Sequence, residues 1–460
     1  MNLPRPVGHQ KKALYLPSSG HQVVLGSAGT GKTVMAALRA QYLSTPGIEG
    51  HGRTLLVTST KALSGYLQHM SRGAPEGLDV RTYGHFARGY LNSRGLMRGR
   101  NIVDSRARRE LVGQAIRAVA DHYPGHSLFG RKVEWFEDEL SWITGMGFQG
   151  EDAYLETERR RRSRIPENSR SIVWEILEHY HDLRDEKGYD FDWDDIAITV
   201  RKELAGDDQP RFYRHVVIDE GQDLSPEEIR SLADAVPPDG SVSFFGDYAQ
   251  QIYGQAMSWK SCGLAVRKVE RFQDNFRNTK AIAKVAIELS SQPFFGDSED
   301  LVEPIAPKVD GAKPTLVECQ DEQEEMEIVR QTARRLSAEG TVAVVGRTWE
   351  EAERLCRGLE SLHVKKNPYS WDAPPGVYRS TYYSVKGLEF DSVIVPFCGA
   401  AHMPSEEALD AFGEEDAMAR EAKLLYVAIT RAKSDLVLTY SGKYPPLLSS
   451  SPGLFTEVRP

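Results

Sequence analysis

The eight-residue run Gly26-Ser27-Ala28-Gly29-Thr30-Gly31-Lys32-Thr33 constrains this chain more than any other stretch. An apolar run precedes it, and a helical pattern follows over residues 34–43. It is the G-x-x-x-x-G-K-[ST] phosphate loop, in the strand, loop and helix context that such a loop requires. Its glycines let consecutive backbone N–H groups point at one anion, beside the positive end of a helix. We therefore predict a nucleotide site in which Lys32 reaches the β- and γ-phosphates and Thr33 binds Mg²⁺.

The length and composition of the chain indicate several domains and no membrane partner. At 460 residues the chain is too long for one hydrophobic core, so we expect two or three domains. No apolar run reaches the ~18 residues of a membrane span, and the first residues lack the apolar core of a signal peptide. We therefore expect a cytoplasmic location. The four cysteines form no C-x-x-C pair, which predicts neither a zinc site nor a disulfide framework.

The net charge of −9 argues against a protein that coats nucleic acid through a general positive potential. It leaves room for a local basic groove. The densest basic cluster, residues 159–164, follows an acidic stretch with a helical pattern. Two interpretations of this cluster stay open: a patch that contacts phosphates, or a solvated helix face whose charges are paired internally.

A second chemical site is predicted where an apolar strand runs into acidic residues. The strand pattern over 215–218 is followed directly by Asp219 and Glu220. In a phosphoryl-transfer site, Asp219 would hold Mg²⁺ and Glu220 would orient and deprotonate the attacking water. Another strand pattern, over 242–246, ends in a polar turn where Gln250 is placed to sense the γ-phosphate.

Polar residues also follow other predicted strands. The buried-strand pattern over 54–58 ends in Ser59, Thr60 and Lys61, and a second such edge covers 80–86. Ligands gather at the carboxyl ends of strands in an open α/β sheet, so these hydroxyls and the lysine could contact a phosphate backbone. Upstream, Gln10 has the donor and acceptor that an adenine edge needs, although a lone glutamine is more often a surface residue.

The pattern of strands and helices divides the chain into three parts. From residue 88 to about 204 the pattern is helical, charges are frequent and strand signals are few. Beyond residue 273, strand patterns again alternate with helical stretches. We therefore predict an α/β protein with two sheet domains: residues 1–87 and 205–272 form the first, residues 88–204 form a mostly helical insertion in it, and residues 273–460 form the second.

The motifs, taken in order, resemble those of a known family. The phosphate loop, residues 219–223 and residues 246–253 resemble motifs I, II and III of the UvrD/Rep-like superfamily I DNA helicases. Further motifs of that family, IV, V and VI, resemble residues 274–279, 381–391 and 421–432. The resemblance implies two RecA-like P-loop motor domains that bind ATP and Mg²⁺ in the cleft between them, with a nucleic-acid strand lying across both. Hydrolysis would open and close this cleft and drive stepwise translocation.

Carried over position by position, the family implies site residues in both domains. The catalytic set is Lys32, Asp219, Glu220, Gln250, Arg277 and Arg431, with Thr33 and Asp219 on the metal. The nucleotide would be bound by Gln10, the phosphate loop from Gly26 to Thr33, Arg39, Phe276, Arg277, Gly387, Glu389 and Arg431. Phe276 would stack on adenine, and the two arginines would reach the γ-phosphate when the cleft is closed. The strand would be held by Thr58, Thr60, Lys61, Thr82, Tyr253, Tyr383 and Ser384, through hydroxyls on phosphates and rings on bases.

Two departures from the family pattern matter. Motif III usually continues with Trp-Arg-Gly-Ala, whose tryptophan stacks on a base, whereas this chain has residues 255–258 as Gln-Ala-Met-Ser. Motif Ia carries an aromatic where this chain has Ser59. Losing two stacking platforms should weaken grip or coupling, and Trp259 could substitute. The stretch between Arg347 and Thr381 is also too short for the accessory domain of long members, which predicts a compact motor.

Two functions remain as hypotheses. The first is an ATPase that is stimulated by single-stranded or partly duplex DNA, with RNA left open, and that translocates and unwinds. The second is a regulatory ATPase switch in a multiprotein DNA-repair or antiviral genome-defence complex, where ATP controls a partner such as a nuclease. The lost stacking residues and the absent accessory domain favour the switch; the intact set Thr381, Tyr383, Ser384 and Lys386 favours the motor. A small-molecule kinase would share the phosphate loop, but it would have no evident use for Arg277 and Arg431 of the second domain.

Overall fold

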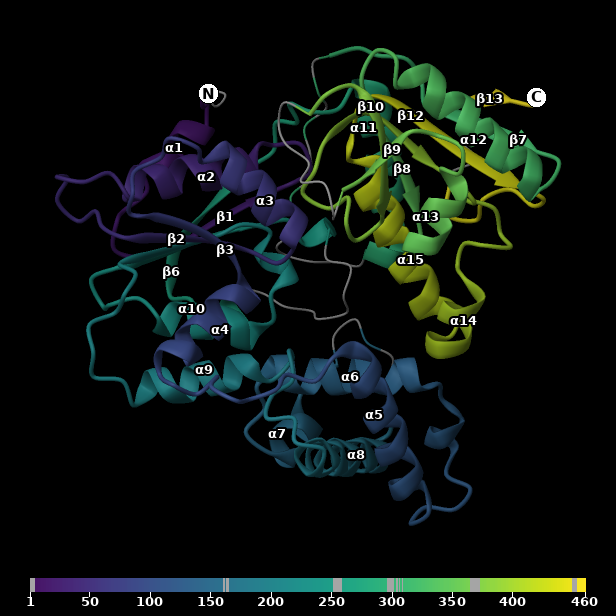
Figure 1. The fold of residues 1–460 in the computed structure, drawn as a ribbon. Helices are drawn as coiled ribbons and strands as arrows, with labels where there is room; N and C mark the ends of the chain where they lie inside the picture. The colour runs from purple at the N-terminus through teal and green to yellow at the C-terminus, as the bar shows by residue number, and fades with distance from the viewer. Residues whose placement is uncertain are drawn as a thin grey trace.

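The computed structural model describes residues 5–159, 162, 165–250, 259–295, 302, 305, 307, 309–364, 373–448 and 453–460. Two α/β parts lie side by side, and a helical part lies below them (Figure 1). All pairings between the described strands are parallel. The predicted fold class, two parallel-sheet α/β domains with a helical insertion in the first, is confirmed. Among the described helices, none is long and apolar enough to cross a membrane.

The first sheet has the strand order β3-β2-β4-β5-β1-β6. Its strands are β1 (Gly20–Gly26), β2 (Thr54–Thr58), β3 (Leu78–Thr82), β4 (His215–Ile218), β5 (Ser241–Gly246) and β6 (Val266–Phe272). Its helices are α1 (Gln10–Leu14), α2 (Lys32–Leu43), α3 (Lys61–Met70), α4 (Tyr83–Ser93), α9 (Ile196–Ala205) and α10 (Pro226–Asp234). Because β1, β2, β4 and β5 are buried on both faces, they read in the sequence as continuous apolar runs rather than as alternating patterns.

Alternation along the strands sends side chains to two separate cores. Val24 and Leu56 pack with the apolar residues of α2 and α3, whereas Val23 and Leu55 pack with those of α4, α9 and α10. Each face of the sheet is therefore covered by its own helices. The carboxyl ends of β1, β2, β3 and β4 are left at one edge, where the predicted polar residues lie.

The helical insertion has a core of its own. Its helices are α5 (Ser105–Ala120), α6 (Val133–Met146), α7 (Glu151–Glu156) and α8 (Glu167–Glu186), and its buried residues run from Val103 to Tyr180. α4 and α9, at the two edges of the predicted segment 88–204, contribute instead to the core of the first sheet. Five short 3₁₀ turns complete the described helices: residues 127–130, 221–223, 248–250, 259–262 and 293–295.

The second sheet has the strand order β13-β7-β12-β11-β8-β10-β9. Its strands are β7 (Thr315–Cys319), β8 (Thr341–Gly346), β9 (Ser361–His363), β10 (Gly376–Thr381), β11 (Phe390–Val395), β12 (Ala432–Ser441) and β13 (Thr456–Val458). Its helices are α11 (Lys280–Ser290), α12 (Glu322–Leu336), α13 (Trp349–Leu355), α14 (Glu406–Phe412) and α15 (Glu414–Ile429). Apolar residues of α12 and α13 cover one face, and those of α11 and α15 cover the other.

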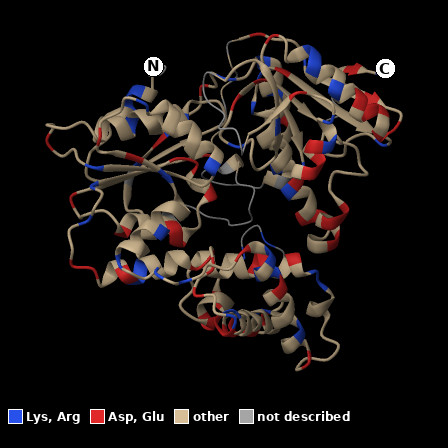
Figure 2. Ribbon diagram, viewed as in Figure 1, with Lys and Arg blue, Asp and Glu red and all other residues tan. Residues whose placement is uncertain are grey.

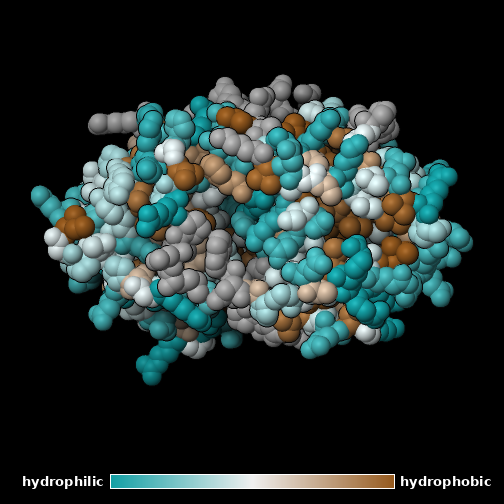
Figure 3. Space-filling view, turned by 90° about the horizontal axis from the view of Figure 1, so that it is seen from above, coloured by the Kyte–Doolittle hydropathy of each residue, from teal (hydrophilic) through white to brown (hydrophobic). Residues whose placement is uncertain are grey.

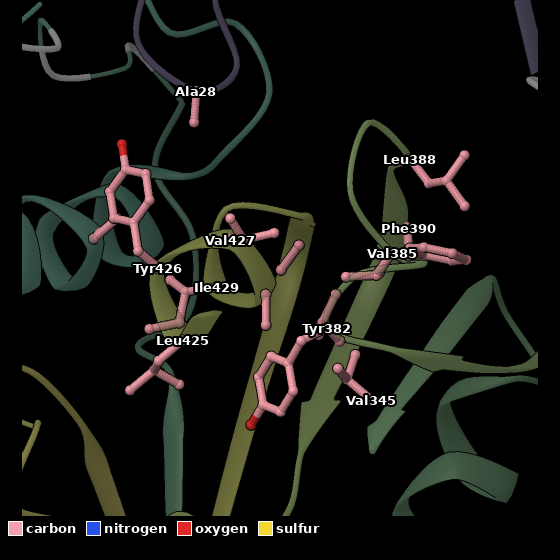
Figure 4. Packing of buried hydrophobic residues seen from close by; sticks show 14 of the residues in the cluster. Ala28, Val345, Tyr382, Val385, Leu388, Phe390, Leu425, Tyr426, Val427 and Ile429 are labelled. Carbon is pink, nitrogen blue, oxygen red and sulfur yellow. The ribbon is translucent and has the colours of Figure 1, made fainter. Parts of the chain in front are cut away.

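One hydrophobic cluster joins the two α/β domains. It contains Ala28 of the phosphate loop and Leu63 of α3, together with Tyr426 and other residues of α15. Figure 4 shows the Tyr426 ring pointing toward the segment that carries Ala28. On the face seen from above, hydrophobic residues are otherwise scattered among hydrophilic ones over the described surface (Figure 3). The phosphate loop is therefore part of the contact between the domains.

The described part of the basic cluster is paired internally. Arg159 and Arg162 both bind Glu139 of α6, which is fully buried, and Arg162 also pairs with Asp138. Tyr154 donates a hydrogen bond to Glu139 at 2.8 Å. Figure 2 shows lysine and arginine interspersed with acidic residues over the insertion. For these two arginines the internal pairing is confirmed, but the solvated helix face is wrong: both side chains are at most 7% exposed, and both residues lie beyond the end of α7. Residues 160, 161, 163 and 164 lie outside the described residues.

We predict that Glu139→Ala destabilises the protein by about 3–5 kcal/mol, because it leaves buried guanidinium groups without a counter-charge. Glu134→Ala is the matched control: its ion pair with Arg109 is largely exposed and should contribute about 0–1 kcal/mol. The free energy of unfolding from urea titrations followed by circular dichroism measures both. Equal losses in the two variants would contradict the prediction.

Candidate nucleotide site between the two sheets

The phosphate loop connects β1 to α2, and its backbone depends on glycine. Gly29 and Gly31 have φ angles of 76° and 80°, in the left-handed region. A Cβ on Gly29 would lie 2.2 Å from Asn275 Oδ1, so this position also has no room for a side chain. α2 begins at Lys32 with a glycine as its N-cap, so no capping side chain covers the N–H groups of its first turn. The loop is therefore shaped to receive an anion at the helix N-terminus.

Lys32 is held inside the loop by groups that a phosphate could replace. Its Nζ donates to the Ser27 carbonyl oxygen at 2.7 Å and lies 3.4 Å from Asp247 Oδ2. The lysine and the aspartate are both buried. A buried ammonium needs anionic partners, and the oxygens of a nucleotide phosphate would supply them.

Asp219 and Glu220 lie at the carboxyl end of β4 and differ in electrostatic environment. Burial, followed by the negative charge of Glu220, raises the pKa of Asp219 to about 8. Burial also acts on Glu220, but the positive charges of Lys32, Lys386 and Arg431 bring the pKa of Glu220 below its ordinary value. Glu220 thus stays ionised at neutral pH, as a proton acceptor requires. Its φ of 52° shows that its backbone is held in a strained conformation at this point.

The Asp219 carboxylate fits a hard divalent cation. Both of its oxygens are buried, and neither has a hydrogen-bond partner among the residues that the structure describes. Such a carboxylate is costly unless a cation binds it. Thr33 supplies a hydroxyl from the first turn of α2, and carboxylate and hydroxyl oxygens are the donors that Mg²⁺ prefers.

Both α/β domains contribute to one cavity at this point. Its lining from the first domain is Gly29, Thr30, Gly31, Lys32, Thr33, Val34, Tyr66, Glu220 and Gln250. Its lining from the second domain is Arg277, Gly387, Glu389 and Arg431. Most of the residues that the motifs predicted are therefore brought together. Tyr66 also lines the cavity and was not among the predicted residues, because its position in the sequence indicates only the apolar face of α3.

The two arginines of the second domain already touch groups in this cavity. Arg431 donates from Nη2 to Gln250 Oε1 at 2.5 Å, and burial lowers the pKa of Arg431 to about 10. Arg277 donates to Glu389 Oε1 at 2.5 Å and to the Thr430 carbonyl oxygen at 3.2 Å. The Arg277 Nε is buried with no hydrogen-bond partner among the described residues. Two guanidinium groups of the second domain thus line the same cavity as the phosphate loop.

A hydrogen-bond chain links these groups through Gln250 and through Gln222 and Asp247, two residues to which the sequence analysis assigns no role. Gln222 donates to Glu220 Oε2 at 2.6 Å, and its Oε1 accepts from the Asp247 N–H at 2.9 Å. Gln250 donates to Asp247 Oδ2 at 2.5 Å and accepts from Arg431. The position of Gln222 within the Asp-Glu-Gly-Gln-Asp run was the available signal. The position of the second-domain arginine is therefore connected to the acid that would act as base.

Comparisons with known proteins agree with this geometry. The family model described as the UvrD/REP helicase N-terminal domain matches residues 7–258, and the UvrD-like helicase C-terminal domain matches residues 370–443. The chain belongs to the UvrD/REP helicase family. The predicted resemblance to UvrD/Rep-like helicases is thus confirmed, and both family domains contribute residues to the cavity described above.

Relatives of this UvrD/REP family member carry helicase names. A probable DNA helicase of Mycoplasma pneumoniae is 24% identical over 94% of this chain and 83% of that protein. A putative ATP-dependent DNA helicase, YjcD of Bacillus subtilis, is 24% identical over 77% of this chain and 47% of that protein. A probable DNA helicase II homolog of Rickettsia conorii is 43% identical over 13% of this chain. The chain spans about half the length of the Bacillus relative and 9% of the Rickettsia relative.

Of the residues expected to bind the nucleotide from outside the phosphate loop, Gln10 and Phe276 lie beside that loop in this helicase-family protein, whereas Arg39 does not line the cavity. Gln10 donates to the Thr30 carbonyl oxygen at 3.0 Å, so it lies against the phosphate loop. The Phe276 N–H donates to the Gly29 carbonyl oxygen at 2.9 Å, so this residue lies beside the phosphate loop. Phe276 is 56% exposed, so its ring is accessible there. Arg39 differs: it is buried and donates to the carbonyl oxygens of residues 14 and 17. Arg39 thus ties α2 to the segment after α1 and does not line the cavity.

The described residues expected to hold a strand lie at or just after the carboxyl ends of β2, β3 and β10. Thr58 and Thr82 are partners in the register of β2 and β3, and the Thr58 hydroxyl is buried with no hydrogen-bond partner among the described residues. Thr60 and Thr82 cap α3 and α4 through their hydroxyls. Lys61 is exposed, Tyr383 is 41% exposed, and Ser384 N–H donates to the Thr381 hydroxyl at 3.3 Å. Tyr253 and residues 255–258 lie outside the described residues.

Trp259 cannot serve as the substitute stacking residue. It is 9% exposed and belongs to the core beneath α10. The Trp259 side chain therefore packs in the core and does not present a ring to a bound strand. The expectation that it replaces a lost platform was therefore wrong.

Lys386 of the second domain contacts the first domain near the carboxyl ends of β2 and β4. Its Nζ donates to the Gln250 carbonyl oxygen at 2.6 Å and pairs with Asp223, and both charged side chains are at most 10% exposed. Asp223 also accepts a hydrogen bond from Ser59 Oγ at 3.3 Å. The pair therefore ties motif V of the second domain to the ends of β2 and β4.

We predict that Lys386→Met lowers the free energy of unfolding by about 3–5 kcal/mol, because Asp223 would be left buried without a cation. Lys280→Met is the control, since the pair of Lys280 with Asp310 is exposed and should be worth about 0–1 kcal/mol. Urea denaturation of both variants provides the measurement. A Lys386 variant as stable as the control would show that this contact does not hold the domains together.

Proposed function

We propose that this chain is an ATP-dependent DNA translocase and helicase motor that hydrolyses ATP between its two α/β domains. The observation that carries the proposal is one cavity that holds a phosphate loop and Glu220 from the first domain and Arg277 and Arg431 from the second. A site divided in this way works only when the domains are closed, which makes hydrolysis and domain movement interdependent. Membership of the UvrD/REP family supports the same activity.

Each residue of the first domain has a defined task in hydrolysis. Lys32 would exchange Ser27 and Asp247 for phosphate oxygens as the nucleotide enters. Asp219 and Thr33 would hold Mg²⁺, which when bound neutralises charge on the phosphate oxygens. Glu220, ionised at neutral pH, would accept the proton of the attacking water.

The second domain would complete the site. Arg431 and Arg277 would move from Gln250 and Glu389 onto the terminal phosphate, where guanidinium groups stabilise the charge of the transition state. Gln250 lies between Arg431 and Asp247, so it is placed to sense whether a γ-phosphate is present. ATP binding would thus close the cleft, and product release would open it.

The substrate we propose is single-stranded or partly duplex DNA. The hydroxyls and N–H groups of Thr58, Thr60, Thr82 and Ser384 suit phosphates, and exposed Tyr383 suits a base, so recognition would not depend on sequence. The printed names of the relatives refer to DNA helicases, which favours DNA over RNA. Alternate opening and closing would then move the strand stepwise across the two domains.

Steady-state ATPase activity with and without single-stranded DNA tests this proposal. We expect strong stimulation by the strand, because strand binding across both domains favours the closed cleft. Lys32→Ala should abolish hydrolysis, and Glu220→Gln should bind ATP without turning it over. Full turnover in either variant would contradict the assigned roles. Hydrolysis that ignores DNA would instead favour a regulatory ATPase that controls a partner, such as a nuclease in a repair or defence complex.

The hydrogen-bond chain makes a separate prediction. Gln222→Leu keeps the volume of the side chain but removes both of its hydrogen bonds, so Glu220 should lose its orientation. We expect kcat to fall by roughly 10- to 100-fold while the affinity for ATP changes little. Phosphate release and binding of a fluorescent ATP analogue measure the two quantities. Gln331→Leu, at an exposed position of α12, is the control. Unchanged kcat in Gln222→Leu would exclude a positioning role.

A further inference from the structure

Arg39 of α2 is a fully buried guanidinium group whose partners are backbone carbonyl groups. Its Nη1 donates to the Leu14 carbonyl oxygen at 2.9 Å, and its Nη2 donates to the Pro17 carbonyl oxygen at 2.6 Å. Among the described residues no carboxylate pairs with it, and its Nε has no hydrogen-bond partner. Burial lowers the pKa of Arg39 to about 10, so the group is still a cation at neutral pH. A buried cation without a counter-charge is costly, so packing alone does not account for this arginine.

The two carbonyl groups that Arg39 binds hold the end of α1. Leu14 is the last residue of α1, and Pro17 follows it in the connection to β1. A helix of five residues is too short to be stable alone, so its position depends on tertiary contacts. Ala13 supplies one such contact in the core that α1 shares with α2, and Arg39 supplies two hydrogen bonds (Figure 1). Arg39 therefore helps to fix where α1 lies against α2.

Gln10, the first residue of α1, lies against the phosphate loop. Its Nε2 donates to the Thr30 carbonyl oxygen at 3.0 Å, and its Oε1 accepts from the Val7 N–H at 3.0 Å. A Cβ on Gly31 would lie 2.7 Å from this Nε2. A side-chain amide has two N–H donors and two acceptor positions, so one of each is left for a ligand. Adenine offers the complementary pair, N7 and the N6 amino group, whereas guanine has the acceptor O6 in place of that amino group.

We propose that Arg39 positions Gln10 through α1 and thereby makes the nucleotide site selective for adenine. This rests on the proposed function, because it concerns the nucleotide that the motor hydrolyses. Arg39 does not line the cavity, so it is a positioning residue. A displaced α1 would move the Gln10 amide away from the base. Lys32 and Glu220 would keep their places, because their hydrogen bonds are to Ser27, Asp247 and Gln222 and not to α1.

Steady-state hydrolysis of ATP and of GTP by the full chain tests the proposal. Arg39→Lys keeps the buried charge, but its single nitrogen cannot reproduce the two-pronged geometry of a guanidinium group. We expect KM for ATP to rise roughly 5- to 30-fold, the range for loss of one or two hydrogen bonds. The kcat at saturating ATP and the KM for GTP should change little, so the ATP-to-GTP ratio of kcat/KM falls. Arg39→Met should lower this ratio at least as far.

Arg170→Met is the matched control. Arg170 of α8 is also a buried arginine whose Nη2 donates to a backbone carbonyl oxygen, that of Thr157, at 3.1 Å. Its Nε likewise has no hydrogen-bond partner among the described residues, and it belongs to the helical insertion. Its loss should lower the free energy of unfolding, measured by urea denaturation, and leave the ATP-to-GTP ratio unchanged. The same pattern in the two Arg39 variants would mean a role in stability alone and would overturn the inference.

Combination with Gln10→Ala shows whether Arg39 acts through this glutamine. Gln10→Ala should lower the ATP-to-GTP ratio, and adding Arg39→Lys should then change it no further. Additive losses, or a normal ratio in Gln10→Ala, would overturn the inference and leave the proposed function standing, because that function is tested by the stimulation of hydrolysis by a DNA strand. If the unmodified protein hydrolyses neither nucleotide, both are overturned.

Discussion

The arrangement of the two α/β domains depends on buried charges of opposite sign that meet where they touch. Glu220 follows β4 of the first sheet, and its carboxylate faces the positive charges of Lys32 from the first domain and of Lys386 and Arg431 from the second. An acid in such a place is costly unless a cation accompanies it. The domains can therefore separate only if solvent or another ligand takes over these charges. A nucleotide triphosphate with its metal ion carries both kinds of partner, which makes this boundary suited to ligand-controlled opening.

The same boundary explains how a change in one domain can reach the other. Arg431, Gln250, Asp247, Gln222 and Glu220 are joined by successive hydrogen bonds of 2.5–2.9 Å. Because each of these residues is a hydrogen-bond partner of the next, a movement of Arg431 requires the others to form new hydrogen bonds. The apolar cluster around Ala28 and Tyr426 limits how far the phosphate loop and α15 can shift without losing contact.

Much of this molecule could be predicted from its sequence, for identifiable reasons. Phosphate-loop chemistry needs glycine at positive φ followed by lysine, and a central parallel strand needs an unbroken apolar run, so β1 and β4 are visible as patterns. Contacts between residues that are distant in the sequence leave no such pattern and could not be predicted. Arg39 is expected to bind the nucleotide, yet its guanidinium donates to backbone carbonyl oxygens, and Trp259 is packed in a core. β13 has three exposed residues and no alternation of apolar and polar side chains, so only its pairing with β7 reveals it.

The helical insertion contacts α15, the helix that leads into Arg431. Arg420 of α15 pairs with Asp138 of α6 at 2.9 Å and lies 3.8 Å from the Phe412 ring, which packs against the core of the insertion. The same helix ends at Ile429, two residues before Arg431. A helix of 16 residues behaves as a rod of about 24 Å. A rotation of α15 would therefore act on both Arg431 and the contact with α6, which connects the insertion to the nucleotide site.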